Sequence, residues 1–240
     1  MRVVPPHSLL LGEHCVRILV LTVVVLIVGS CAKFPSTGGG AGATRLIFQM
    51  ELDGAINPNF VYIVALNPST EDNPTTEGPI PVIAPPWGNG FVEGGVTHFV
   101  RWDTSQSPHY LIFKFRDAQL IEFFETGVPI NYLEVEPGGR IIRFEIELTQ
   151  IAADLTEAQS FRTLQVNFLT MDNVPQGTGG DKSWDALGDG TLPGEINEWV
   201  NIPLRTSGVY DNRRFQDLEP VGDNPDPALD IKDWFVEVRL

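Results

Sequence analysis

The sequence is poor in the side chains that most often carry catalysis. It has two cysteines, Cys15 and Cys31, and four histidines, of which only His98 and His109 lie beyond the first 31 residues. This shortage excludes a zinc site of the His/Cys type unless carboxylates complete it. The chain also lacks a G-x-S-x-G turn, a G-x-x-x-x-G-K-[ST] loop and a strand-linked G-x-G-x-x-G. Neither a serine-hydrolase elbow nor a phosphate cradle is therefore indicated, and no catalytic residue is assigned.

Positive charge is also scarce. There are 16 Lys and Arg against 31 Asp and Glu, which gives a net charge of −15. Such a chain repels nucleic acid and anionic lipid head groups, so no nucleic-acid partner is expected. It is suited to cations, and Ca²⁺ in particular takes carboxylate and carbonyl oxygens. The alternative is that the acidity only keeps an exported protein soluble.

The amino-terminal region carries an export signal. Arg2 and Arg17 precede an apolar run from Ile18 to Val28, and the small residues Gly29-Ser30 come just before Cys31. The run is too short to cross a bilayer comfortably, since a transmembrane helix needs roughly 20 apolar residues.

The four residues Val28-Gly29-Ser30-Cys31 resemble the lipobox of bacterial lipoproteins. The resemblance implies that the chain is cut before Cys31, and that the Cys31 thiol carries a diacylglycerol that anchors the protein to a membrane. The protein would then lie in the bacterial cell envelope and face the extracytoplasmic side. Loss of residues 1–30 removes Cys15, so Cys31 could form no intramolecular disulfide. The alternative is an ordinary secretory signal or an uncleaved anchor with an incidental cysteine.

Three regions follow from this pattern. Residues 1–30 are interpreted as a lipoprotein signal peptide, and residues 31–44 as the lipidated cysteine with a flexible Gly-rich tether. Residues 45–240 are long enough for a single large β-domain with its own core. The folded part would stand off the membrane at the end of the tether.

Strand patterns dominate residues 45–240. In Arg45–Leu52, apolar residues alternate with polar ones, which buries one face of a strand and exposes the other. Further strands are predicted at Phe60–Leu66, Tyr110–Arg116, Arg140–Leu148, Arg162–Thr170 and Lys232–Leu240, with weaker candidates at Thr97–Trp102, Leu120–Phe124, Asn131–Val135 and Glu198–Leu204.

The connections between these strands are rich in turn residues, and only Asp154–Ser160 has a helical signature, because Asp154 and Glu157 stand at capping-box spacing. Since a parallel sheet would need longer helical crossovers, the fold class is predicted to be an all-β antiparallel β-sandwich, immunoglobulin-like or jelly-roll-like. Arg45–Leu52 and Phe60–Leu66 are expected to form a hairpin. The last strand is expected to be paired into a sheet.

Three long connections, Pro68–Gly95, Asp172–Gly194 and Asp211–Asp230, are candidates for function, because long loops in compact domains are usually functional or disordered. In the second, Asp185 and Asp189 match the first and fifth positions of an EF-hand loop, followed by Gly190. The third and twelfth positions do not match. Asp185 and Asp189 are therefore candidate Ca²⁺ ligands, and their alternative role is to form turns.

Aromatic residues in the same connections suggest a second kind of site. Trp87, Phe91 and Trp184 lie in or beside the loops, where a flat ring can stack on a sugar while nearby polar groups bind its hydroxyls. The alternative is that these rings are buried anchors of the loops.

The export signal, the tether and the strand pattern together resemble β-sandwich lipoproteins of bacterial envelopes, and more loosely carbohydrate-binding sandwiches. The resemblance implies a non-catalytic lipoprotein, anchored by its lipid, that binds a glycan or an envelope protein. Two alternatives stay open. One is a carboxylate-dependent glycan hydrolase, because acidic pairs are available throughout the chain. The other is a purely structural role in envelope assembly.

Overall fold

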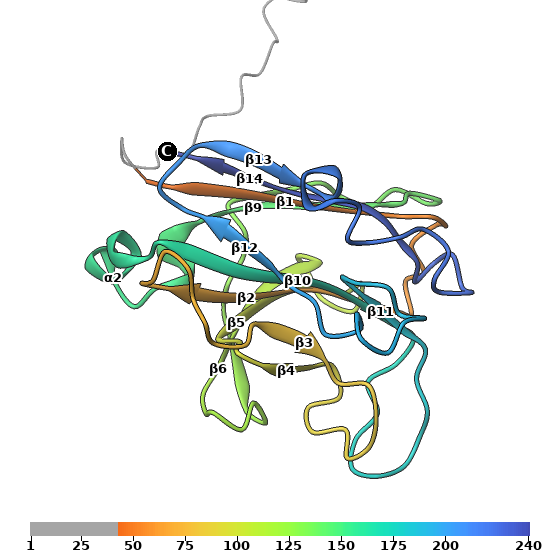
Figure 1. Ribbon diagram of the computed structural model, residues 1–240. Coiled ribbons are helices and arrows are strands. Elements are labelled where there is room, and N and C mark those ends of the chain that lie inside the picture. The colour runs from red at the N-terminus through yellow and green to blue at the C-terminus, as the bar shows by residue number, and fades with distance from the viewer. Residues whose placement is uncertain (1–42) are drawn as a thin grey trace, which may run out of the picture. The chain divides into compact units, whose positions relative to one another are not determined.

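Two antiparallel β-sheets packed face to face form the framework of the protein (Figure 1). The computed structural model describes residues 43–240. The expected lipobox, Cys31 and most of the expected tether lie outside the described residues. The prediction of an all-β sandwich is confirmed.

The first sheet has the order β13-β14-β1-β9-β8. Its strand β1 is central and pairs with β14 on one side and β9 on the other. The alternation predicted for β1 is present, because Leu46, Phe48, Met50 and Leu52 are fully buried. The strands are β13 (Gly208–Asp211), β14 (Ile231–Arg239), β1 (Arg45–Leu52), β9 (Ile141–Glu147) and β8 (Asn131–Tyr132).

The second sheet has the order β11-β10-β2-β5-β6-β7, and β12 pairs with the opposite end of β10 from β11. All nine residues of β10 are buried, because its outer face is covered as well. The strands are β11 (Trp184–Ala186), β10 (Thr163–Met171), β2 (Val61–Ser69), β5 (His98–Trp102), β6 (Tyr110–Phe115), β7 (Phe123–Gly127) and β12 (Val200–Pro203).

The hydrophobic core lies between the two sheets. Phe48 and Phe144 stack with ring centroids 5.1 Å apart, and Phe168 of β10 packs against Trp234 of β14 at 5.6 Å. These pairs join strands that are distant in the sequence. Burial of such apolar area is the main favourable term in folding.

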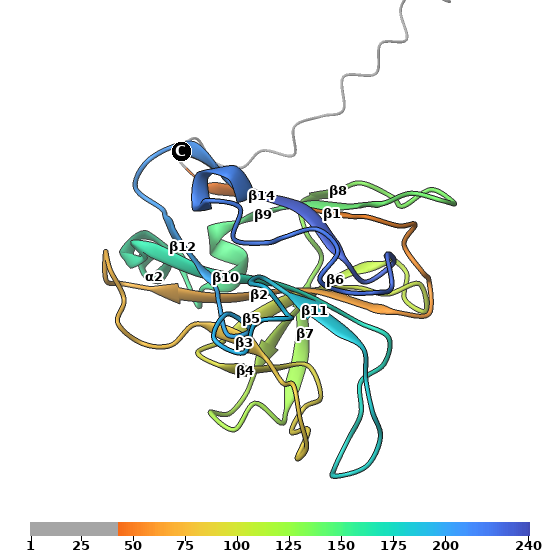
Figure 2. The ribbon, with the colours of Figure 1, turned by 45° about the vertical axis from the view of Figure 1, so that its right-hand side comes forward.

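The long connection after β2 covers the outer face of the second sheet, and contains a small separate sheet of β3 (Pro79–Pro81) and β4 (Val92–Gly94) (Figures 1 and 2). Polar side chains of β10 bind this cover. Asn167 Nδ2 donates to the carbonyl of Pro79 (2.9 Å), and Gln165 Nε2 donates to that of Thr76 (3.0 Å). These hydrogen bonds offset the cost of burying the amides.

The short helices are peripheral: η1 (Leu148–Ile151), α2 (Leu155–Ser160) and η2 (Asn212–Phe215). The predicted cap of α2 is present, because the Glu157 N–H donates to Asp154 Oδ1 (2.9 Å). Within residues 43–240, the helices are all too short or too polar to cross a membrane.

The expected hairpin between the first two strands is wrong. β1 belongs to the first sheet and β2 to the second, so the intervening segment crosses between the sheets. The end of β1 stays bound to its own sheet, where the Leu52 N–H donates to the carbonyl of Arg140 (2.9 Å). Alternation in a strand indicates which face is buried, but it does not identify the partner strand. The strand at the carboxyl terminus is paired, as predicted.

Candidate metal centre and binding cleft

An acidic cluster lies where the edge strand β11 meets the connection that leads into β14. Asp185 is the middle residue of β11 and is only 2% exposed. Its carboxylate accepts hydrogen bonds from the N–H of Ala186 (Oδ1, 3.0 Å) and from that of Ile231, the first residue of β14 (Oδ2, 2.7 Å). Asp185 therefore links an edge strand of one sheet to a strand of the other.

The second carboxylate comes from Glu219, in the connection between η2 and β14. Glu219 is 1% exposed, and its Oε2 accepts a hydrogen bond from the Gly188 N–H (3.1 Å). The side chain of Asn212 binds the backbone of Glu219 on both sides, since Nδ2 donates to the Glu219 carbonyl (2.7 Å) and Oδ1 accepts from its N–H (2.9 Å). The position of Glu219 is thus fixed by local structure.

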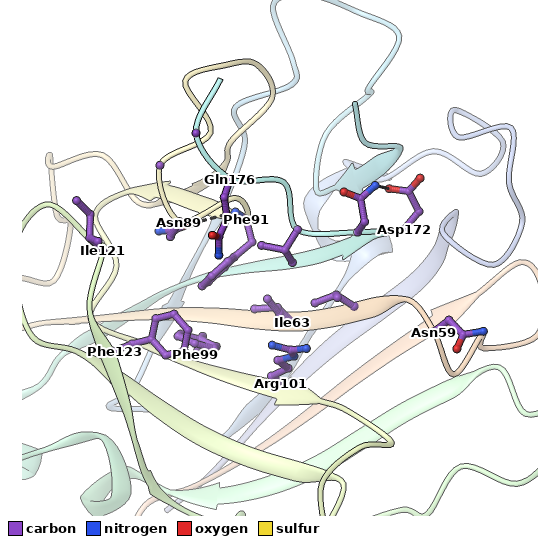
Figure 3. Close-up of a pocket in the computed structure, with 15 residues that line it drawn as sticks. Asn59, Ile63, Asn89, Phe91, Phe99, Arg101, Ile121, Phe123, Asp172 and Gln176 are labelled. Atoms are coloured by element: carbon purple, nitrogen blue, oxygen red, sulfur yellow. Dashed lines mark hydrogen bonds between the residues drawn. The ribbon is translucent and has the colours of Figure 1, made fainter. Parts of the chain in front are cut away.

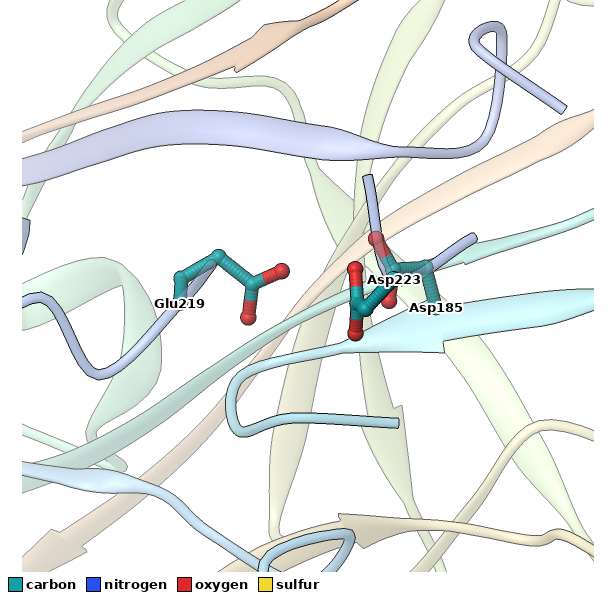
Figure 4. Close-up of side chains that lie close together, drawn as sticks. All are labelled: Asp185, Glu219 and Asp223. Carbon is teal, nitrogen blue, oxygen red and sulfur yellow. The ribbon is translucent and has the colours of Figure 1, made fainter. Parts of the chain in front are cut away.

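Asp223 completes the cluster from the same connection. Its Oδ2 accepts from the Gly190 N–H (2.8 Å). One oxygen of each of Asp185, Glu219 and Asp223 lies within 4.8 Å of the other two, and Figure 4 shows the carboxyl group of Glu219 pointing toward the two aspartates. Two further oxygens, Glu219 Oε1 and Asp223 Oδ1, are buried and have no hydrogen-bond partner among the described residues.

The electrostatic environment disfavours three free charges. Burial, together with the neighbouring carboxylate of Asp223, raises the pKa of Asp185 to about 8. Burial and the two aspartates raise the pKa of Glu219 well above its usual range, and the pKa of Asp223 is raised as well, chiefly by burial. The ion pairs among residues 43–240 do not include these three carboxylates. The cluster could hold a metal ion such as Ca²⁺.

Of the two predicted Ca²⁺ ligands, the structure places only Asp185 in the cluster. Asp189 is partly exposed, and its Oδ1 accepts from the N–H of Thr191 (2.8 Å), a turn-forming contact. Sequence reasoning missed Glu219 and Asp223, which belong to the third long acidic connection. The acidity of that connection was visible in the sequence, but its meeting with β11 was not.

A cleft of about 660 Å³ opens on the outer face of the second sheet (Figure 3). Ile63, Phe99 and Arg101, from β2 and β5, line it, together with residues of two loops, 88–91 and 172–177. One side is aromatic, since Phe91 packs edge-on against Phe99 at 5.1 Å between ring centroids. The cleft therefore combines an apolar region with polar loops.

Arg101 is the cation of this cleft. Its Nη2 lies 2.8 Å from Asp103 Oδ2, and its Nε is buried with no hydrogen-bond partner among residues 43–240. The side chain of Asn89 stabilises the loop 88–91, because its amide donates to the carbonyls of Val92 (2.8 Å) and Leu120 (2.9 Å). Asn59 and Gln176 are exposed at the rim.

The three predicted aromatic candidates have different surroundings. Phe91 lines the cleft, although it is mostly buried. Trp87 is 4% exposed, its Nε1 donates to the carbonyl of Gly179 (3.1 Å), and the ammonium of Lys182 lies 5.5 Å from the centroid of its ring. Trp184 is half-buried and packs against the apolar cluster on the outer face. Trp87 thus anchors its loop and Trp184 packs on the sheet, and neither residue lines the cleft.

Comparisons with family models, with curated proteins and with solved structures found no match to this chain. The chain is defined by its fold, an antiparallel β-sandwich, and by the two features just described.

Proposed function

We propose that this protein is a non-catalytic lipoprotein of the bacterial cell envelope, anchored by Cys31, whose β-sandwich binds a glycan in the cleft and uses Ca²⁺ as a cofactor. A protein partner is the alternative ligand. The observation that carries the binding function is the cleft over β2 and β5, which joins an aromatic region to polar side chains.

The shape and lining of the cleft favour a glycan. A volume of about 660 Å³ lies within the range of roughly 300–1,000 Å³ typical of small-ligand sites. Phe123 lines the cleft and keeps 38% of its surface exposed, so a sugar ring can pack against it. Arg101, Asn59 and Gln176 supply donors and acceptors for hydroxyl groups.

Ca²⁺ is the proposed cofactor because the acidic cluster offers only oxygen ligands. Hard cations bind carboxylates, and Ca²⁺ accepts variable geometry with six to eight oxygens. The proposed role is structural rather than catalytic, since Ca²⁺ would neutralise the three carboxylates and hold the elements that carry them.

Anchoring is supported by the resemblance of Val28–Cys31 to a lipobox. The test is a Cys31→Ser variant expressed in a bacterial host. It should leave the membrane fraction and lose labelling by a fatty-acid analogue. Wild-type levels of the variant in the membrane would show that the apolar segment 18–28 is itself the anchor.

Glycan binding is tested by titrating soluble envelope polysaccharides and their fragments into the full-length protein. Phe123→Ala and Arg101→Ala should each weaken binding at least tenfold, because they remove the stacking surface and the cation of the cleft. The matched control is Leu155→Ala, since Leu155 is exposed on α2 and does not line the cleft. Equal affinity of all three variants would contradict the proposal. Release of new reducing ends during the titration would favour the hydrolase instead.

A further inference from the structure

We infer that Asp185, Glu219 and Asp223 together bind one divalent cation, with Ca²⁺ preferred over Mg²⁺, and that this ion fastens the edge strand β11 of one sheet to the connection that leads into β14 of the other. The inference rests on the proposed Ca²⁺ cofactor and adds the ligand oxygens of the ion, its preference over Mg²⁺ and the junction that it fastens.

The first observation is that three acidic side chains converge without a cationic partner. Three carboxylates converge within 4.8 Å, and Asp185 and Glu219 are almost completely buried. Buried carboxylates are ordinarily paired with a cationic side chain or with a metal, because an isolated buried charge is costly. Lys, Arg and His residues of the described part of the chain form their ion pairs elsewhere. A bound cation would supply the missing positive charge.

The second observation is independent of charge. Glu219 Oε1 is buried without a hydrogen-bond partner among the described residues, and the carboxyl group points into the cluster (Figure 4). Asp223 Oδ1 is also buried and has no hydrogen-bond partner among the described residues. Buried polar atoms in native proteins nearly always have a partner, so two unpaired oxygens at one place point to a ligand-binding position.

The remaining oxygens of the same side chains explain how the site is oriented. Glu219 Oε2 is held by the N–H of Gly188 and Asp223 Oδ2 by that of Gly190. In Glu219 and in Asp223, one oxygen thus fixes the side chain and the other is left for the ion, whereas both oxygens of Asp185 also accept backbone hydrogen bonds. Metal ligands are commonly oriented in this way by hydrogen bonds from outside the coordination sphere.

The backbone at Gly188 is adapted to this arrangement. Its φ is +105°, a conformation that favours glycine, and a Cβ there would collide with the carbonyl oxygen of Glu195. A glycine at this position lets the chain turn after β11 so that its N–H donates to Glu219.

The oxygen ligands and their spacing decide between metals. Two oxygens on opposite sides of Ca²⁺ lie about 4.6–5.2 Å apart, since Ca–O distances are about 2.3–2.6 Å. Separations of at most 4.8 Å among the three carboxylates are compatible with such a shell. Mg²⁺ has shorter bonds and requires near-octahedral geometry, so three side chains fixed by the fold suit it less well.

The ion would reinforce a junction that otherwise depends on few contacts. β11 has only three residues in register with β10. It is tied to β14 of the other sheet by the hydrogen bond from the Ile231 N–H to Asp185, and to the connection before β14 by that from Asn224 Nδ2 to the carbonyl of Trp184 (2.7 Å). A cation shared by Asp185, Glu219 and Asp223 would add a direct link across the same junction.

The test is calorimetric titration of Ca²⁺ into metal-free full-length protein. One ion should bind per chain, and Mg²⁺ should bind at least tenfold more weakly. Glu219→Gln and Asp223→Asn should each weaken Ca²⁺ binding at least tenfold. Asp189→Asn is the matched control, because Asp189 is an acidic residue four positions after Asp185 that lies outside the cluster, and it should bind like wild type. Circular dichroism establishes that each variant is folded, and Asp223→Asn decides the result if Glu219→Gln does not fold.

The outcomes distinguish the site of the ion from the use of Ca²⁺ as a cofactor. Wild-type Ca²⁺ affinity in folded Asp223→Asn would overturn the site assigned here, while Ca²⁺ would remain the cofactor. Loss of Ca²⁺ binding in Asp189→Asn alone would place the ion in the Asp185–Asp189 segment. This result too would overturn the site and leave Ca²⁺ as the cofactor. Absence of Ca²⁺ binding by the wild type would refute both the cofactor and the site. Glycan binding is measured separately and would be unaffected by these results.

Discussion

Replacing Glu219 with glutamine is expected to stabilise the metal-free protein. Glutamine keeps the size of the side chain and an oxygen that can accept from the Gly188 N–H. It removes one of three converging carboxyl groups and replaces Oε1, which has no hydrogen-bond partner, by an amide donor beside the carboxyl groups of Asp185 and Asp223. A hydrogen bond to a charged group contributes about 1.5–3 kcal/mol. We expect the free energy of unfolding in chelator to rise by about 1–3 kcal/mol relative to wild type.

Ca²⁺ should reduce this advantage. An ion that binds only the folded state adds about 2.7 kcal/mol when its concentration is 100 times the dissociation constant. If the variant binds Ca²⁺ about 100-fold more weakly, it gains only about 0.4 kcal/mol at the same concentration. The difference between variant and wild type should therefore shift by about 2.3 kcal/mol in favour of wild type.

Urea denaturation at pH 8, followed by tryptophan fluorescence, measures both effects. Each protein is unfolded in chelator and again at Ca²⁺ fixed at 100 times the wild-type dissociation constant, and the midpoints are compared at unchanged slope. Asp189→Asn should respond to Ca²⁺ like wild type. A Glu219→Gln variant that is less stable than wild type in chelator, or that gains as much from Ca²⁺, would refute the reasoning.

Three further results are expected. Burial, with Lys114 nearby, lowers the pKa of His98 to about 4, against about 6.5 in an unfolded chain, so the unfolded state binds more protons between these values. The contribution of His98 to stability should therefore fall by up to about 3 kcal/mol as pH decreases from 6.5 to 4, so in urea titrations wild type should lose about this much relative to His98→Gln over that range. Phe144→Ala should lower the free energy of unfolding by about 3–5 kcal/mol, because its ring is buried between the sheets, and a small effect in thermal unfolding would contradict this packing. Gly188→Ala should lower the free energy of unfolding by about 2 kcal/mol or more and weaken Ca²⁺ binding more than tenfold, because the added methyl group collides with the carbonyl of Glu195 next to the cluster. Wild-type Ca²⁺ affinity in calorimetry would count against the role of this turn.

The strands that could be predicted are those long enough to show a period. Arg45–Leu52 was located to the residue, and Tyr110–Arg116 and Lys232–Leu240 to within one residue at each end, because alternation over six or more residues reports which face is buried. β3, β4, β11 and β13 were not predicted and the equally short β12 was only a weaker candidate, since three or four residues carry too little pattern. The partner of β1 was also wrong, because pairing depends on contacts between distant segments.

The candidate site was predictable only in part for the same reason. Asp185 was a predicted Ca²⁺ ligand because its spacing from Asp189 matches part of an EF-hand loop, which is a local sequence pattern. Its actual neighbours, Glu219 and Asp223, come from another connection, and are brought to it by the pairing of β11 with β10 and of β14 with β1. No local motif records that meeting. A sequence pattern can name one member of such a cluster, while the fold supplies the others.

The acidity of the loops takes two structural forms, and the difference identifies the site. Asp103, Asp189 and Asp226 each accept a hydrogen bond from the N–H two residues ahead, which is the usual way in which aspartate shapes a turn. Such residues are at least partly exposed and need no further ligand. Glu219 is buried, and one of its oxygens has no partner in the described part of the chain. Solubility accounts for the first form but not for the second, because a buried carboxylate adds nothing to the surface charge that keeps a protein in solution. Burial combined with an unsatisfied oxygen, rather than the number of acidic residues, therefore marks the place where a cation would bind.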